Sequence, residues 1–120
     1  MKSQQSRLVY IVDDDEAARD YLRFLLESHD IETRCCRSAD EFLRANPTDM
    51  ACIVLDLHMP ERNGLDLLRH LRSSGLPVPV IIVSGRLDAA LEAEVRAAGA
   101  TATLSKPFDD QVLLALVRQA

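Results

Sequence analysis

Short apolar runs alternate with amphipathic runs five times along this 120-residue chain. Compact apolar runs of this length are typical of buried strands, whereas the runs between them repeat apolar residues at helical spacing. The strands are expected at 8–12, 31–36, 51–55, 78–83 and 101–104. Because parallel neighbours need a crossover helix between them, five strand-helix units predict a parallel α/β sheet with helices on both faces.

The helical runs carry start and stop signals. Ser38 with Glu41 three residues later forms a capping box for the second helix. Gly75 and Gly99 follow the third and fourth helices as expected for helix ends. The helices are expected over 16–28, from 38 onward, around 65–71, over 87–98, and from Asp109 or Asp110 to the end of the chain.

Composition places the chain among ordinary globular domains. The net charge of −5 argues against direct nucleic-acid binding. No apolar run approaches the roughly 18 residues that span a membrane, and the polar residues 1–6 are expected to be a flexible tail before a single domain at 7–120. Three cysteines without metal-site spacing predict reduced thiols in a cytoplasmic protein, with a redox role as the alternative.

Polar residues follow four of the five expected strands. In open α/β sheets, ligands bind beyond the carboxyl ends of the strands, so these residues are expected to lie together. They are Asp13, Asp14, Asp15, Asp56, Ser84 and Lys106. Two carboxylates about 4 Å apart repel by about 4 kcal/mol at an effective dielectric near 20, and a hard cation such as Mg²⁺ relieves that repulsion. A carboxylate can also act as a nucleophile toward phosphorus.

Lys106 stands out within this chain. Twelve of the fourteen basic residues are arginine, and the other lysine is Lys2 in the expected tail. An ammonium is a compact point charge that a planar guanidinium does not replace. With Ser84 and the backbone N–H groups beside Gly85, Lys106 could bind the oxygens of a transferred phosphoryl group; the alternative is a surface lysine.

Four motifs together resemble the receiver domain of bacterial response regulators. They occur in the family's order and spacing and span nearly the whole chain. They are Ile11-Val-Asp-Asp-Asp15, Leu55-Asp-Leu-His-Met-Pro60 followed by Asn63-Gly64, Val83-Ser-Gly85, and Ser105-Lys-Pro-Phe108. The resemblance implies a flavodoxin-like (βα)₅ fold with strand order 2-1-3-4-5.

The resemblance also implies roles for the site residues. Asp56 would be the phosphoacceptor, and Mg²⁺ (with Mn²⁺ as the alternative ion) would be bound by Asp14, by Asp13 largely through water, by Asp56 and by the backbone carbonyl of His58. Ser84 would be the switch hydroxyl, assisted by Gly85. Lys106 would pair with Asp56 or its phosphate. The Lys106–Pro107 bond would be cis. These roles concern Asp13, Asp14, Asp56, His58, Ser84, Gly85, Lys106 and Pro107.

Partners follow from the same resemblance. A sensor histidine kinase or a histidine phosphotransfer domain would donate the phosphoryl group. An output domain or partner protein would read the switch, and a homodimer could form through the fourth helix, fifth strand and fifth helix. Thr103 departs from the family, which usually has Tyr or Phe three residues before the lysine. The route of the output is therefore open.

Alternatives remain for several residues. Asp15 is either a fourth acid or the N-cap of the first helix, and His58 and Arg86 lie at the expected rim of the pocket. A Mg²⁺-dependent phosphatase would need an acid two residues after Asp56, where this chain has His58. A receiver that serves only as a binding module is the third hypothesis, kept open by Thr103. The leading prediction is a switch that is not an enzyme on a separate substrate.

Overall fold

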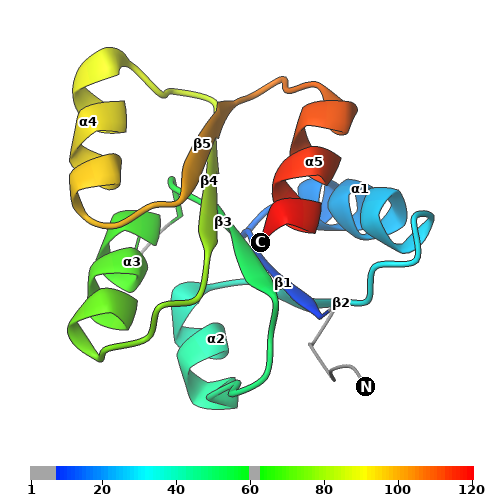
Figure 1. The fold of residues 1–120 in the computed structure, drawn as a ribbon, viewed down its shortest axis with the longest axis horizontal. Coiled ribbons are helices and arrows are strands. Elements are labelled where there is room, and N and C mark those ends of the chain that lie inside the picture. The colour runs from blue at the N-terminus through cyan, green and yellow to red at the C-terminus, as the bar shows by residue number, and fades with distance from the viewer. Residues whose placement is uncertain (1–7, 60–62) are drawn as a thin grey trace.

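The structure, a computed structural model, describes residues 8–59 and 63–120. Five parallel strands form one sheet in the order β2-β1-β3-β4-β5 (Figure 1), which confirms the predicted fold. The strands are β1 (Val9–Val12), β2 (Thr33–Cys36), β3 (Cys52–Asp56), β4 (Val80–Ser84) and β5 (Ala102–Ser105). The helices are α1 (Glu16–Glu27), α2 (Ala39–Ala45), α3 (Gly64–Ser73), α4 (Ala89–Ala97) and α5 (Asp110–Gln119).

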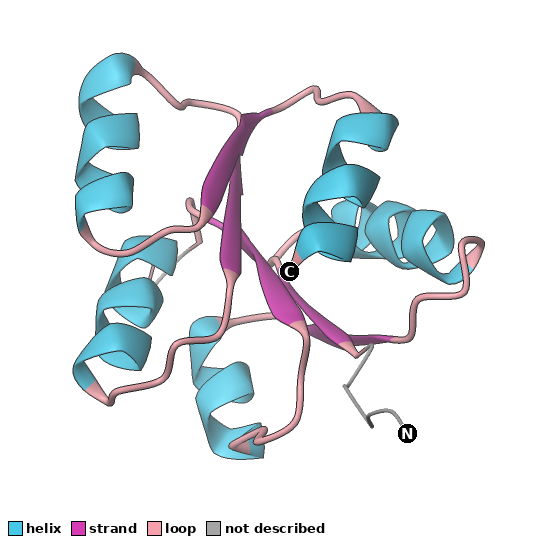
Figure 2. Ribbon diagram, viewed as in Figure 1, coloured by secondary structure: helices cyan, strands magenta, loops and turns pink. Residues whose placement is uncertain are grey.

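Helices cover both faces of the sheet (Figures 1 and 2). Helices α1 and α5 lie on one face, and α2, α3 and α4 lie on the other. The buried residues accordingly form two clusters, one on each side of the sheet. Every residue of β1, β3 and β4 is buried, as expected for central parallel strands. Cys36 and Cys35 face opposite clusters, as their adjacency predicts, and all three cysteines are free thiols.

A side-chain N-cap marks the start of each of the five helices. The carboxylate of Asp15 accepts from a backbone N–H in the first turn of α1, and Ser38 and Asp109 do the same for α2 and α5, at 3.0, 3.0 and 2.8 Å. Asp15 is therefore an N-cap, and Asp109 caps the last helix. Asp110 instead accepts a hydrogen bond from the Tyr21 hydroxyl, which joins α5 to α1.

Some predicted boundaries are wrong by a few residues. The strand expected from 78 begins at Val80, because Pro79 has no N–H to donate to a ladder; its carbonyl still accepts from the Ile53 N–H at 3.0 Å. Leu87 precedes α4, whose N-cap is Asp88. The expected tail at 1–6 lies outside the described residues. Within the described ranges, no helix has the length and apolar character needed to cross a bilayer.

Candidate functional site

The predicted site residues meet at the carboxyl edge of the sheet. Asp13 directly follows β1, Asp56 ends β3 and Ser84 ends β4. Lys106 comes directly after β5, whose last residue pairs with Ser84 in the parallel ladder. The strands β1, β3 and β4 are buried along their whole length, whereas β5 is only partly buried. The sheet therefore holds Asp13, Asp56 and Ser84 at a fixed edge.

Three carboxylates form an acidic cluster at this edge. Asp13, Asp14 and Asp56 each place one oxygen within 4.8 Å of the others. Asp13 is only 1% exposed and Asp56 only 7% exposed, whereas Asp14 is exposed to solvent. Hard oxygen donors with excess negative charge and one open side are the ligand set that Mg²⁺ prefers. The residues therefore fit a hard divalent cation.

Asp13 is held by its own loop and by α1. Its Oδ1 accepts from the Asp15 N–H at 2.9 Å, and its backbone carbonyl accepts from Arg19 Nη1 at 2.8 Å. Arg19 was missed by the sequence reasoning, because nothing in the strand-end pattern singles out an arginine in the second turn of a helix. Its bond to the main chain fixes the turn that presents the buried carboxylate.

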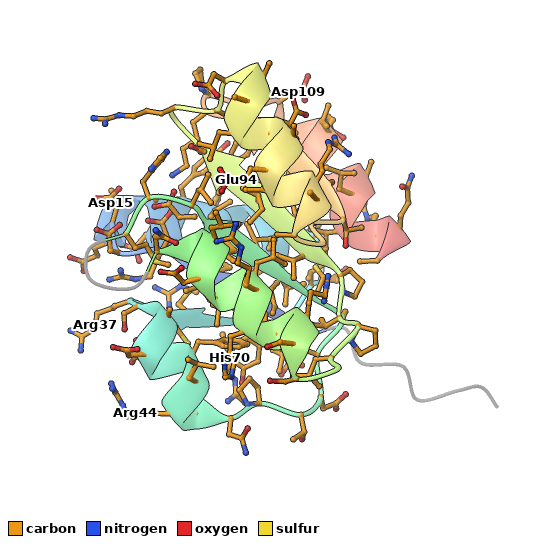
Figure 3. The ribbon with its side chains drawn as sticks, turned by 90° about the vertical axis from the view of Figure 1, so that its left-hand side faces the viewer. Asp15, Arg37, Arg44, His70, Glu94 and Asp109 are labelled. Carbon is orange, nitrogen blue, oxygen red and sulfur yellow. The ribbon has the colours of Figure 1, made fainter. Side chains whose placement is uncertain are left out.

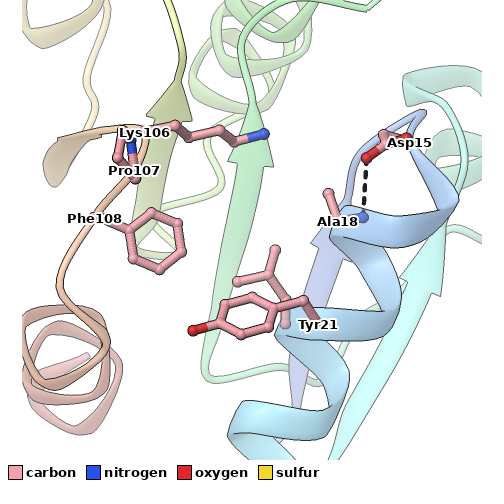
Figure 4. Close-up of a pocket in the computed structure, with 7 residues that line it drawn as sticks. Asp15, Ala18, Tyr21, Lys106, Pro107 and Phe108 are labelled. Atoms are coloured by element: carbon pink, nitrogen blue, oxygen red, sulfur yellow. Dashed lines mark hydrogen bonds between the residues drawn. The ribbon is translucent and has the colours of Figure 1, made fainter.

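Lys106 supplies the only ammonium at the cluster among the described residues. Its side chain extends from the end of β5 across the ends of the strands toward the β1–α1 loop (Figure 4). Its Nζ lies 3.3 Å from Asp13 Oδ2 and 3.9 Å from Asp56 Oδ1. The closer partner is Asp13, so the lysine stands between two acids. The Lys106–Pro107 bond is cis, as expected.

Burial dominates the electrostatics of Asp56. Burial and the negative charge of Asp13 raise the pKa of its carboxyl to about 6, while Lys106 and the His58 N–H pull that pKa down. The His58 bond is long, at 3.5 Å to Asp56 Oδ1, and the His58 side chain is exposed. The ionised carboxylate is thus poorly compensated, and an added cation would stabilise it.

Ser84 is fully buried beside the cluster, at the start of the loop that leads into α4. Its Oγ accepts from the Arg86 N–H at 3.1 Å, and its backbone carbonyl accepts from the Lys106 N–H at 2.8 Å. Gly85 and Arg86 are exposed at the rim. Thr103 is not at the site: it lies within β5, paired with Ile82 in the ladder.

The chain resembles known proteins over nearly its whole length. The family model described as "Response regulator receiver domain" matches residues 9–118. The transcriptional regulatory protein FixJ of Azorhizobium caulinodans is 43% identical over 115 residues, which are 95% of this chain and 54% of the relative. The response regulator protein TodT of Pseudomonas putida is 36% identical over 119 residues, 98% of this chain and 52% of the relative.

Solved structures agree with the sequence relatives. The crystal structure titled FixJ-N has a TM-score of 0.86 at 32% identity and covers 98% of this chain and 94% of its own. Full-length FixJ from B. japonicum has a TM-score of 0.87 at 35% identity, covering 97% of this chain and 58% of its own. This chain spans about half the length of the curated relatives it matches. It belongs to the response regulator receiver domains of two-component systems.

Proposed function

We propose that this domain is a switch in which Asp56 accepts a phosphoryl group from a phosphohistidine of a sensor kinase or phosphotransfer domain. The observation that carries the proposal is the placement of Asp56. Its carboxylate is buried at the strand edge between two further acids and the ammonium of Lys106. That arrangement suits a nucleophile whose product carries more negative charge than the starting side chain.

The transfer exchanges a P–N bond in the donor for a P–O bond on Asp56. An Asp56 oxygen forms a bond to phosphorus as the P–N bond to the donor imidazole breaks, and the electron pair of that bond stays on the nitrogen, which is then protonated. The nucleophile must be ionised. With a pKa of about 6, most Asp56 carboxyls are ionised above neutral pH, before any cation lowers that pKa further.

The neighbouring residues would handle the charge of the phosphoryl group. Asp14, Asp13 through water, Asp56 and the backbone carbonyl of His58 would hold Mg²⁺, or Mn²⁺ in its place. When bound, the ion would neutralise charge on the transferred oxygens. Lys106, already within 4 Å of both buried acids, would turn its ammonium to the phosphoryl oxygens.

Ser84 would report that the phosphoryl group has arrived. Its hydroxyl is an acceptor for the Arg86 N–H, and a hydroxyl can also donate one hydrogen bond. We propose that it donates to a phosphoryl oxygen, with the Gly85 N–H as a second donor. The β4–α4 loop would then follow the serine and pass the change to the surface.

The reader of the switch would lie outside the receiver. The curated relatives are about twice as long as this chain, and their names are those of transcriptional and response regulators. We propose that an output domain or a partner protein responds to the phosphorylated receiver. The phosphorylated receiver could pass its signal on by forming a homodimer through α4, β5 and α5.

Phosphorylation by a small donor tests the proposal. The domain is incubated with acetyl phosphate, with Mg²⁺ or with a chelator, and its intact mass is measured. The expected result is addition of one phosphoryl group that needs the cation and is absent from Asp56→Asn. Asp20→Asn is the matched control, because Asp20 is an exposed aspartate of α1 that pairs with Arg23 at 2.9 Å. Failure to label the wild type with any donor or cation would refute the switch.

A further inference from the structure

Thr103 takes part in a polar network between α4 and β5. Its hydroxyl donates to Glu92 Oε2 at 2.8 Å. Arg96, one turn further along α4, places Nη2 within 3.4 Å of both the Thr103 oxygen and the Glu92 carboxylate. Thr103 and Arg96 together lower the pKa of Glu92, which keeps this carboxylate ionised as an acceptor. The network occupies the position where the family usually has an aromatic ring.

The rest of α4 is only lightly anchored. Val95 is the only fully buried residue in the helix, and Leu91 is partly buried against the same core. Helix α3, by comparison, buries four residues along its length. Because few apolar contacts resist a displacement of α4, polar contacts along its seam with β5 weigh more in deciding where the helix sits.

The loop before α4 links this network to the site. Only residues 85–88 separate Ser84 from the first residue of the helix, and the Ser84 hydroxyl holds that loop through the Arg86 N–H. On the other side, β5 continues from Thr103 to Ser105, and the next residue, Lys106, donates its backbone N–H to the Ser84 carbonyl. Both ends of the network are thus tied to residues that would touch the phosphoryl group.

We propose that Thr103, Glu92 and Arg96 form a latch that ties α4 to β5 in the unphosphorylated domain and opens when Asp56 is phosphorylated. The inference rests on the proposed function, which supplies the phosphoryl group that draws Ser84 and its loop inward. The latch stabilises one of two conformations, so its strength sets how readily the other is populated.

Thr103→Val tests the latch with little change in shape, because valine replaces the hydroxyl by a methyl group. The rate of Asp56 labelling by acetyl phosphate is measured by intact mass at saturating Mg²⁺. If loss of the latch makes the phosphorylation-competent conformation easier to reach, labelling should become about two- to fivefold faster. Thr103→Ser keeps the hydroxyl and should restore the wild-type rate.

Two further variants separate the latch from general effects on α4. Glu92→Ala should speed labelling like Thr103→Val, and the double variant should be no faster than either, because both changes break one contact. Glu94→Ala is the matched control. Glu94 lies on the same helix (Figure 3), where it pairs with Arg69 of α3 at 3.2 Å and not with a residue of β5. Its labelling rate should stay at the wild-type value.

Hydrogen exchange of the α4 amides provides the second readout. In the unphosphorylated domain, exchange in α4 should be faster in Thr103→Val than in wild type, and in the phosphorylated domain the two should be equal. Equal labelling rates in wild type and Thr103→Val would overturn the latch, even if exchange differs, since the network would then be structural only. Absence of label in the wild type would instead overturn the proposed function.

Discussion

The ionised Asp56 carboxylate should destabilise the fold in the absence of a cation, and Asp56→Asn should relieve that cost. Folding raises the pKa of Asp56 from 3.8 to about 6, through burial first and the charge of Asp13 second. At about 1.4 kcal/mol per pKa unit, the ionised form costs the folded state about 3 kcal/mol. Since only 9% of the side chain is exposed, solvent screens little of this.

The contribution of Asp56 to the free energy of unfolding should change with pH in a definite direction. A carboxyl whose folded pKa lies above its unfolded pKa binds protons more tightly in the folded state. Its contribution to stability is therefore fully present below about pH 4 and is lost as the pH rises toward about 6. Asparagine is neutral throughout. The difference in the free energy of unfolding, Asp56→Asn minus wild type, should be near zero at pH 4 and about 3 kcal/mol at pH 8.

Urea unfolding followed by circular dichroism between pH 4 and pH 8, with a chelator present, measures this difference. The chain has no tryptophan, so far-ultraviolet dichroism is the suitable signal. Saturating Mg²⁺ should reduce the difference in the free energy of unfolding between Asp56→Asn and wild type at pH 8. The cation binds the folded wild type and stabilises it by mass action. Asp20→Asn should change stability by less than about 0.5 kcal/mol at every pH. The reasoning would be refuted if the stability difference between Asp56→Asn and wild type did not vary with pH, or if Asp56→Asn were less stable than wild type at pH 8.

Three other substitutions test separate parts of the structure. Lys106→Met removes the counter-charge that lowers the pKa of Asp56, so labelling by acetyl phosphate should slow by on the order of tenfold or more and its pH midpoint should rise. Gly64→Ala would place a Cβ 2.5 Å from the Asp56 carbonyl oxygen, and urea unfolding should show a loss of about 1–3 kcal/mol from overpacking; unchanged stability would contradict the close approach. Phe42→Ala removes a buried ring that packs edge-on against the ring of Tyr10, with 5.4 Å between the ring centroids. Thermal unfolding should show that the free energy of unfolding falls by about 3–5 kcal/mol.

Periodicity predicted the layers because the strands are buried along their whole length. The run 51–55 has no charged residue to obscure the pattern, and its residues 52–55 lie in β3 (Cys52–Asp56), where every residue is buried. The site was predictable for a related reason: parallel strands bring their carboxyl ends to one edge, so Asp13 and Asp56 were expected to meet without knowledge of any contact. Local signals also sufficed for the N-cap Ser38, whose partner lies three residues away. For Asp15 they left an N-cap and a fourth acid open, and the structure shows the N-cap.

The sequence did not predict side-chain contacts between different elements. The bond from Thr103 to Glu92 joins residues eleven apart on different elements, and it depends on how α4 is rotated against the sheet. The same holds for Arg19, whose partner is a main-chain carbonyl that any residue would supply. The closer approach of Lys106 to Asp13 than to Asp56 likewise depends on the side-chain conformation of the lysine, which no spacing rule determines.

The poorly compensated charge of Asp13 and Asp56 and the weak anchoring of α4 are functionally connected. The buried strands β1 and β3 hold Asp13 and Asp56 at the carboxyl edge, so the two carboxylates cannot separate to relieve their repulsion. The packing of these strands offsets the free-energy cost of that repulsion. A cation can lower that cost, whereas a phosphoryl group on Asp56 adds negative charge beside Asp13, so each favours a different state of the site. Their binding energy is useful only if some element can move in response. Helix α4, with Val95 as its single fully buried residue and a polar contact to Thr103, is the element whose position a few hydrogen bonds can decide.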